Sequence, residues 1–353
     1  MGVRPSDGLG LPDRKLILAG DIGGTKCTLA LFARTNSSLR RVYRSTLATR
    51  DFRSLRDLLN RFRTHTRQHG FRLKDGELGS AAFGVAATIV GDEIVTGNLP
   101  WPVEAKVISR ALDLKRRHVF LFNDLVATAL SLIHLRQKDV LQLNRGRPRP
   151  QAPKALIAAG TGLGEAVLFW DGESYQVSPS EAGLTDFAPR NDCELLLLQL
   201  LRKHSDRVCT EEIISGRGFQ VIHRAMFPDS QHSFFSDAAV DAAAQITRRA
   251  LSGSCTACVQ TLHIWSEAYG AEAGNMALRV LPFGGVYVAG GIALKILPKL
   301  KDGSFVKAFS DKLQLSRQLA KIPIFIVLNE DAPVLGAAYE ALMRTTHARH
   351  GAR

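Results

Sequence analysis

The chain has 353 residues, of which 46 are Lys or Arg and 33 are Asp or Glu, giving a formal net charge of +13. Hydrophobic residues make up 45% and charged residues 22%, as in an average globular protein, which excludes disordered, collagen-like and disulfide-scaffold chains. The longest apolar runs fall far short of the ~20 residues that cross a bilayer, so we expect no membrane partner. Five cysteines, an odd number, fit a reducing compartment, and we expect a cytoplasmic protein.

The positive charge is confined to the first part of the chain. Residues 1–150 hold 26 basic and 13 acidic residues, whereas residues 151–353 hold 20 of each. A solvated Arg-rich surface explains the excess, because apolar residues in 54–63 recur at helical spacing and leave the arginines facing water. A nucleic-acid surface is the sharper alternative. Neither an Arg/aromatic stacking platform nor zinc-finger spacing occurs in the sequence, so we expect no nucleic-acid partner.

Patterns typical of strands and helices alternate along the chain, which predicts an α/β fold. The expected strands are 16–20, 28–32, 81–89, 93–95, 118–122, 155–159, 166–170, 286–289 and 322–328. The expected helices are 54–69, 125–135, 193–203, 236–251, 255–280 and two that begin near Ala293 and at Pro333. Gly91 and Asp92 are expected to form a hairpin turn. The stretch 145–153 has three prolines and no periodicity, which predicts a loop or an interdomain connection.

Two segments of the chain echo each other. Residues 16–25 and residues 155–164 both contain an apolar strand, a glycine-rich turn and the start of a second strand. Two similar halves that each offer a glycine turn to a common cleft are one way to build a two-domain nucleotide site. We call residues 21–26 the first glycine turn and residues 160–164 the second glycine turn.

The first glycine turn combines residue types that suit a bound phosphate. Gly23 and Gly24 let backbone N–H groups approach an anion closely. Thr25 adds a hydroxyl donor, Lys26 adds a positive charge, and Asp21 offers Mg²⁺ a carboxylate, through water. A structural explanation stands equally beside this one: a β-hairpin in which the glycines supply positive φ angles.

The second glycine turn does not match a dinucleotide-binding fingerprint. Glu165 stands where the third glycine belongs, and a strand follows instead of a helix. A third glycine pair, Gly290-Gly291, follows an expected strand and precedes an expected helix. Backbone donors at that position favour an anion or a nucleotide.

Three further places offer carboxylates, each with a structural and a functional explanation. Asn123-Asp124 ends a strand and starts a helix, where Asp is a favoured N-cap. At the carboxyl edge of a sheet, the same carboxylate could accept the proton of a substrate hydroxyl. Glu181 lies in a turn-rich stretch, and Glu211 is either an ordinary first-turn acid of a helix or a ligand group.

The cysteines suggest packing rather than metal binding. Cys255 and Cys258 have the spacing of half a zinc site, but the sequence shows no second half, because the ten histidines have no paired spacing. Cys193 and Cys209 are isolated. We therefore expect core thiols.

Eight segments, in this order, resemble bacterial glucokinase, a sugar kinase family of the actin/hexokinase/heat-shock ATPase superfamily. They are 20–25 (GDIGGT), 96–101 (TGNLPW), 122–125 (FNDL), 159–164 (AGTGLG), 180–181 leading to 186–189 (SE and DFAP), 211–216, 283–291 (FGGVYVAGG) and 335–338 (LGAA). They span most of the chain, which makes the resemblance specific.

The resemblance implies ATP-dependent phosphorylation of the 6-hydroxyl of glucose, with Mg²⁺ neutralising charge. Asp124 would be the base that accepts the hydroxyl proton. The residues that would hold the sugar hydroxyls are Asn98, Asn123, Glu181 and Glu211. The ATP-binding residues would be Asp21, Gly23, Gly24, Thr25, Lys26, Gly160, Thr161, Gly162, Gly290 and Gly291, with Asp21 holding Mg²⁺ through water.

The resemblance also implies two α/β lobes with an actin/hexokinase-like (ribonuclease H-like) fold and an active-site cleft between them. We expect a small lobe of residues 15–135 plus 332–353, a large lobe of residues 136–331, and an N-terminal extension of residues 1–14. We further expect a homodimer that acts on glucose or a related hexose.

One departure from the family concerns Leu184. Glucokinases usually carry Glu-Gly-Gly-His where this chain has Glu-Ala-Gly-Leu at 181–184. A histidine there could bond a sugar hydroxyl and Leu184 cannot, so we expect weaker glucose binding and relaxed selectivity. The alternatives are a kinase for another hexose and a non-catalytic, sugar-sensing or regulatory homologue.

Overall fold

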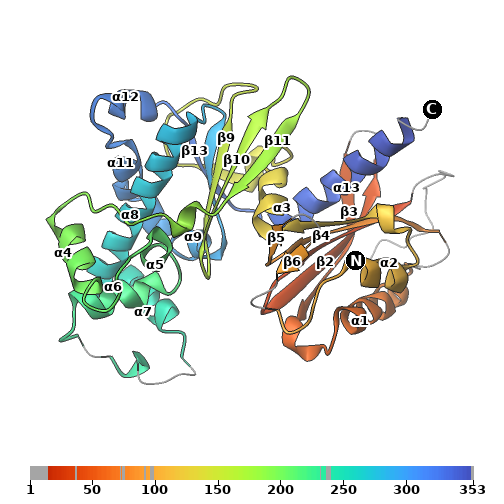
Figure 1. The fold of residues 1–353 in the computed structure, drawn as a ribbon, viewed down its shortest axis with the longest axis horizontal. Helices are drawn as coiled ribbons and strands as arrows, with labels where there is room; N and C mark the ends of the chain where they lie inside the picture. The colour runs from red at the N-terminus through yellow and green to blue at the C-terminus, as the bar shows by residue number, and fades with distance from the viewer. Residues whose placement is uncertain are drawn as a thin grey trace. The chain divides into compact units, whose positions relative to one another are not determined.

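The computed structural model describes residues 15–35, 38–71, 73, 76–90, 93–95, 99–230, 232–235 and 240–350. The described chain divides into two compact units. The first unit runs to Leu135 and resumes at Asp331, and the second unit is Arg136–Glu330. Each unit is built on one large β-sheet that helices cover (Figure 1).

The sheet of the first unit has five strands in the order β3-β2-β1-β4-β7. They are β1 (Leu16–Ile22), β2 (Lys26–Arg34), β3 (Leu39–Ala48), β4 (Leu78–Val85) and β7 (Val119–Asn123). The pairs β1–β2 and β2–β3 are antiparallel, whereas β1–β4 and β4–β7 are parallel. The carboxyl ends of β1, β4 and β7 therefore lie at one edge of the sheet.

Helices cover both faces of this sheet because its central strands are apolar on both sides. The helices are α1 (Leu55–Gln68), α2 (Ala105–Leu112), α3 (Asp124–Ser131) and α13 (Ala332–His350), with short 3-10 turns at Thr49–Asp51 and Arg116–His118. Leu18 and Leu29 pack with α1 and α2, whereas Ile17 and Ala30 pack with α13. In Figure 1, α1 and α2 lie on one side of the sheet and α13 on the other.

Helix α1 confirms the amphipathic pattern of residues 54–63. Its buried residues are Leu55, Leu58, Leu59, Phe62 and Thr66. Arg56 and Arg61 on the opposite face are exposed. The helix begins after Ser54, whose hydroxyl accepts a hydrogen bond from the N–H of Asp57 at 3.1 Å, a typical N-cap.

The expected strand 81–89 is wrong as a single element. It consists of the end of β4 and the start of β5 (Thr88–Val90), which pairs with β6 (Glu93–Val95) in an antiparallel hairpin. The chain turns between them, where the N–H of Ala86 donates to the carbonyl of Ile22 at 3.0 Å. A continuous apolar run does not reveal such a turn. Gly91 and Asp92 lie outside the described residues.

The sheet of the second unit has six strands in the order β11-β10-β9-β12-β13-β8. They are β8 (Val140–Gln142), β9 (Lys154–Ala159), β10 (Leu163–Trp170), β11 (Tyr175–Ser180), β12 (Gly285–Ala289) and β13 (Ile324–Val327). The pairs β9–β10 and β10–β11 are antiparallel, and β9–β12 and β12–β13 are parallel. The first five strands in this order thus repeat the pairing of the first unit. The two echoing sequence segments form the first strand and the turn of the hairpins β1–β2 and β9–β10.

Helix α8 forms the centre of the second unit's core. The helices are α4 (Asp192–Leu201), α5 (Thr210–Ile213), α6 (Gly218–Met226), α7 (Ala242–Leu251), α8 (Thr256–Val280), α9 (Gly291–Lys295), α10 (Leu297–Leu300), α11 (Ser304–Ser310) and α12 (Ser316–Leu319). Short 3-10 turns lie at Gln137–Asp139, Ala182–Leu184, Ser233–Phe235 and Leu313–Leu315. Trp265 and Tyr269 of α8 are fully buried against β9 and its neighbours. The hydroxyl of Tyr269 donates to the carbonyl of Ile157 at 3.2 Å, which joins α8 to β9.

Two expected helices are shorter than the sequence suggests. Helix α3 ends at Ser131, because the next turn tightens and the buried Leu132 continues the apolar run outside the helix. Helix α7 begins at Ala242, where the Asp241 carboxylate caps it by accepting from the N–H of Ala244 at 3.1 Å. Residues 236–239 of that prediction lie outside the described residues.

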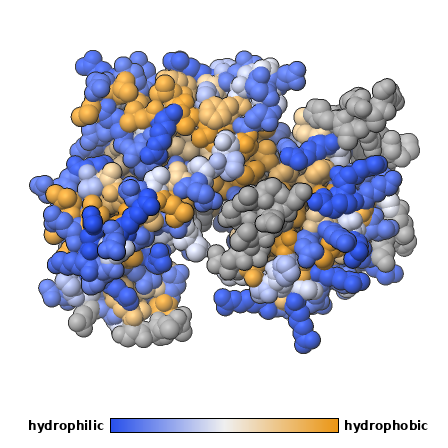
Figure 2. Space-filling view, in the orientation of Figure 1, coloured by the Kyte–Doolittle hydropathy of each residue, from blue (hydrophilic) through white to orange (hydrophobic). Residues whose placement is uncertain are grey.

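The surface is mixed in character. On the visible face of each unit, hydrophilic and hydrophobic residues are intermixed (Figure 2). Among the described helices, none combines the length and apolarity that a membrane span requires.

Candidate active site

The first glycine turn joins β1 to β2 as a tight hairpin. The N–H of Gly23 donates to the carbonyl of Lys26 at 3.1 Å, and the hydroxyl of Thr49 donates to the carbonyl of Gly23 at 2.6 Å. Neither Gly23 nor Gly24 has a positive φ angle. The β-hairpin that the sequence predicted as a structural explanation is therefore confirmed, but positive φ angles are not the reason for its two glycines.

Asp21 lies near the end of β1 in acidic surroundings. Burial, helped by the negative charges of Asp124 and Asp331 and opposed by Lys26, raises the pKa of Asp21 from 3.8 to about 7. A carboxylate that is crowded by other carboxylates gains free energy when a cation binds beside it. The residues at this edge of the first sheet therefore suit a divalent cation.

Asn123 and Asp124 occupy the junction of β7 and α3. The side-chain oxygen of Asn123 accepts hydrogen bonds from the N–H groups of Leu125 at 2.9 Å and Val126 at 3.3 Å. Asn123 is thus the N-cap, and the alternative explanation of Asp124 as the cap is wrong. The Asp124 Oδ1 also accepts from the N–H of Leu125 at 2.9 Å. Burial raises the pKa of Asp124 above its ordinary value.

The parallel register brings Asp21 and Asp124 to the same edge of the first sheet. Asp21 of β1 is paired with Gly84 of β4, and Gly84 is paired with Phe122 of β7, two residues before Asp124. Two acidic groups that are far apart in the sequence thus stand at the carboxyl ends of parallel strands, where open α/β folds bind ligands.

The second glycine turn joins β9 to β10 and is tied to Glu211. The carboxylate Oε2 of Glu211 accepts a hydrogen bond from the N–H of Leu163 at 2.8 Å. A Cβ atom added at Gly162 would lie 2.3 Å from this Oε2, so any larger residue would require the Glu211 carboxylate to shift. The carbonyl of Gly160 accepts a hydrogen bond from the N–H of Gly216 at 2.8 Å. Thr161 is exposed at the tip of the turn.

Gly290 directly follows β12 and lies beside the second glycine turn. Its φ angle is +94°, and an added Cβ atom would lie 2.7 Å from the carbonyl oxygen of Ala159, which precedes the turn. Gly291 begins the short helix α9. The second glycine turn, Gly216 and Gly290 therefore form a backbone-rich surface with little side-chain bulk.

Glu181 directly precedes the 3-10 turn that follows β11, and Leu184 ends that turn. The carbonyl of Glu181 accepts a hydrogen bond from the N–H of Leu184 at 3.0 Å. Both side chains are exposed, and Leu184 leaves 53% of its surface accessible. An apolar side chain so exposed contributes little to the core, which leaves position 184 available to a ligand.

Known proteins resemble this chain in sequence and in structure. A family model described as Glucokinase matches residues 18–344. The glucokinase of Nostoc sp. strain PCC 7120 is 38% identical over 342 residues, covering 92% of this chain and 98% of its own length. The glucokinase of Synechocystis sp. is 34% identical over 346 residues, covering 91% and 96%. The crystal structure of glucokinase from an Antarctic psychrotroph is 27% identical, with a TM-score of 0.79 and coverage of 94% and 99%. The chain belongs to the glucokinase family.

Membership of the glucokinase family makes this chain an ATP-dependent glucose kinase. It confirms the two-lobed actin-like fold class and the enzyme class that the sequence predicted. The roles of individual residues in this glucokinase stay predictions. Asn98, one of the expected sugar ligands, and the extension 1–14 lie outside the described residues.

Sequence reasoning about this glucokinase missed Asp331, which directly precedes α13. Its carboxylate pairs with the guanidinium groups of Arg41 and Arg44, with the Arg44 Nε 2.9 Å from Oδ1. Its charge also acts on Asp21. An aspartate before a helix reads as an ordinary cap in the sequence. Only the packing of α13 on the first sheet brings it to the acidic edge.

Proposed function

We propose that this glucokinase transfers the γ-phosphoryl group of ATP to the 6-hydroxyl of glucose with Asp124 as the general base. The hydroxyl oxygen bonds to the γ-phosphorus, and the bond from that phosphorus to the bridging oxygen of ADP breaks. The hydroxyl proton passes to the Asp124 carboxylate. The products are glucose 6-phosphate and ADP.

The observation that carries this proposal is the environment of Asp124. Burial raises its pKa above the ordinary 3.8, and a general base works best when its pKa lies near the working pH. Its Oδ1 accepts the N–H of Leu125. The second carboxylate oxygen is the one that would accept the substrate proton.

The sugar hydroxyls are proposed to contact Asn98, Asn123, Glu181 and Glu211. The side-chain amide nitrogen of Asn123 donates one hydrogen to the carbonyl of Ala87 at 2.9 Å, which leaves its second hydrogen for a hydroxyl oxygen. Glu211 binds Leu163 through Oε2, which leaves Oε1 as an acceptor. Glu181 is exposed and offers both oxygens.

ATP is proposed to bind through its phosphates at the two glycine turns and through its adenosine side at Gly290-Gly291. The N–H of Gly23 donates to the carbonyl of Lys26, and the N–H of Gly160 donates to the carbonyl of Gly162. The donors proposed for phosphate are therefore other backbone N–H groups of the turns, such as those of Gly24 and Gly162, and the hydroxyls of Thr25 and Thr161. Lys26 is exposed and adds positive charge. Mg²⁺ neutralises phosphate charge in this chemistry, and the crowded carboxyl of Asp21 suits it through water.

The cellular setting and assembly are also proposals. All five cysteines are free thiols, which supports a reducing cytoplasm. We propose a homodimer, which light scattering of the purified chain would test against a monomer.

The test of the activity is a coupled ADP-release assay with ATP, Mg²⁺ and a panel of hexoses and amino sugars. We expect ADP release to depend on glucose and on Mg²⁺, with the phosphate on the 6-oxygen. A preferred substrate other than glucose would identify a kinase for another hexose. Tight glucose binding without ADP release from any sugar would instead identify a regulatory homologue and overturn the proposal.

A further inference from the structure

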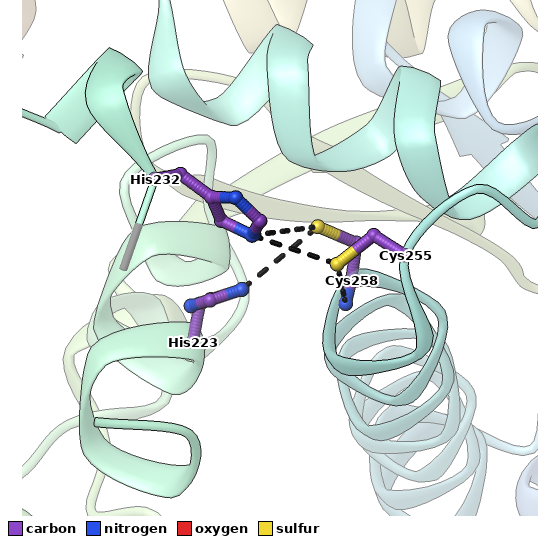
Figure 3. A group of neighbouring side chains, drawn as sticks. All are labelled: His223, His232, Cys255 and Cys258. Carbon is purple, nitrogen blue, oxygen red and sulfur yellow. Dashed lines mark hydrogen bonds between the residues drawn. The ribbon is translucent and has the colours of Figure 1, made fainter. Parts of the chain in front are cut away.

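His223, His232, Cys255 and Cys258 form a cluster in the second unit that the proposed reaction does not use. Their four candidate ligand atoms all lie within 4.8 Å of one another. His223 belongs to α6, His232 follows that helix, and the cysteines stand at the start of α8. Figure 3 shows a ring nitrogen of each histidine pointing toward the sulfur atoms.

Three distances within the cluster are close to those of a tetrahedral metal site. The Nε2 atom of His232 lies 3.5 Å from Sγ of Cys255 and 3.8 Å from Sγ of Cys258, and Nε2 of His223 lies 3.8 Å from Sγ of Cys258. Zinc bonds of about 2.3 Å to sulfur and about 2.0 Å to nitrogen, at tetrahedral angles, separate the two atom types by about 3.5 Å. These three nitrogen–sulfur pairs thus already have close to the spacing that a zinc ion requires, and the remaining pairs lie within 4.8 Å.

The sequence alone predicted core thiols because only half of a zinc site was visible. The folded chain supplies the other half from residues 23 and 35 positions upstream of the cysteines they face. A hydrogen-bonded core of thiols and imidazoles is the competing explanation, since S–H groups donate weakly to ring nitrogens. Four side chains of the two types that zinc prefers, converging from three segments, favour a metal.

We propose that these four side chains bind one zinc ion. Two thiolates and two imidazoles complete the closed, four-coordinate set of a structural site and leave no position for a substrate. Sulfur and imidazole ligands disfavour Mg²⁺, which prefers oxygen, so this ion is distinct from the Mg²⁺ of phosphoryl transfer.

The surroundings of the cluster suit a structural ion. The ring of Phe234 stacks on His232 with centroids 4.7 Å apart, and the ring of Phe235 lies 5.2 Å from that of His223. Such an apolar shell limits access of water to the metal. Zinc would join the two ends of the segment 223–258, which contains α7, and would hold α6 against the start of α8.

The same two helices hold the backbone around the second glycine turn. The indole N–H of Trp265 in α8 donates to the carbonyl of Ser215 at 3.1 Å, just before α6. The N–H of Gly216 in turn donates to Gly160. Zinc at the far ends of α6 and α8 would therefore stabilise the unit that carries the proposed nucleotide groups.

The experiment uses the full chain, reduced and stripped of metal, and titrated with zinc or with Co²⁺. We expect one zinc per chain, a rise of several degrees in Tm on zinc addition, and a Co²⁺ spectrum with thiolate charge-transfer and tetrahedral d–d bands. Cys255→Ser and His232→Asn alter half-buried ligands, and we expect each to weaken zinc binding by more than about 100-fold, because even outer-shell changes cost 10–100-fold.

Matched controls replace the same residue types outside the cluster. Cys193→Ser and His204→Asn change exposed side chains and should keep the stoichiometry and affinity of the parent. No zinc uptake by the reduced parent chain, or a Co²⁺ spectrum without thiolate bands, would overturn the proposal. Unchanged zinc binding in both cluster variants would overturn it as well. If those variants do not fold, the Co²⁺ spectrum of the parent chain decides.

Discussion

The carboxylate of Glu211 and the backbone N–H of Leu163 are joined by a hydrogen bond of 2.8 Å. It links α5 to the second glycine turn across 48 residues of sequence. The bond holds one oxygen of Glu211 on the turn proposed to bind phosphate and leaves the other for the proposed sugar contact. In the proposed site, this one side chain would therefore set the distance between the two substrates.

Glu211→Ala should lower kcat/KM for glucose. A hydrogen bond to a charged group contributes about 1.5–3 kcal/mol, and at 1.4 kcal/mol per decade its loss corresponds to about a 10- to 100-fold decrease. Steady-state kinetics with glucose and ATP varied separately would measure it. Glu212→Gln is the neighbouring control, since Glu212 bonds the N–H of Cys209 and not the turn. Equal effects of the two variants would contradict the role of Glu211.

Gly162→Ala tests the same contact from the other side. The new methyl group would lie 2.3 Å from the Glu211 Oε2 and must displace it. In the Glu211→Ala background the clash is absent, so the two changes should be strongly non-additive. Additive effects would show that Gly162 matters for another reason.

Asp124→Asn should lower kcat by ~10²-fold or more, the usual contribution of a general base. The variant keeps the shape of the side chain, and Asn123 still caps α3, so Tm should change little. Asp57→Asn removes the same charge from the first turn of α1 and serves as the control. Near-parent turnover would refute the assignment of the base. A joint loss of stability and activity would instead indicate a structural role.

Glu165→Gln should stabilise the protein at alkaline pH. Glu165 is 2% exposed, and its Oε1 has no hydrogen-bond partner among the described residues. Burial, followed by the charge of Glu272 and opposed by Arg279, raises its pKa from 4.5 to about 8.

The sign follows from the protons bound in each state. Between pH 4.5 and about 8, the Glu165 carboxyl is deprotonated in the unfolded chain and protonated in the folded chain. The contribution of Glu165 to the free energy of unfolding is therefore full below pH 4.5 and is lost as the pH rises through about 8. At about 1.4 kcal/mol per pKa unit, the variant should gain about 2–4 kcal/mol over the parent by pH 8. Urea unfolding from pH 5 to 9 would measure the difference in unfolding free energy between variant and parent, with Glu173→Gln, at an exposed position, as the control. A difference in unfolding free energy that does not grow with pH would contradict the raised pKa of Glu165.

Leu184→His should lower the KM for glucose and sharpen hexose selectivity. Leu184 is exposed and cannot pair with a hydroxyl. A hydroxyl without a partner costs about 1–3 kcal/mol, so restoring the partner should lower KM about 5-fold or more. Leu184→Ala removes the apolar side chain without adding a hydrogen bond and separates the two effects. If Leu184→His leaves the KM and the hexose profile unchanged, residue 184 does not touch the sugar.

The sequence by itself determined what depends on local pattern. The buried stripe of α1 follows from apolar spacing, and the two hairpins follow from apolar runs that flank glycines. These features hold because helical and strand periodicities act over a few residues. The repeated strand pairing was visible only as the echo of residues 16–25 in residues 155–164.

Only the tertiary structure decided which distant groups meet. Asp331 acts on Asp21 because α13 packs on the first sheet, and Glu211 reaches Leu163 because α5 lies against the second glycine turn. His223 faces Cys258 because α6 packs beside the start of α8. Each pair is separated by tens to hundreds of residues, and the order of strands and the packing of helices, which local periodicity does not encode, set its distance.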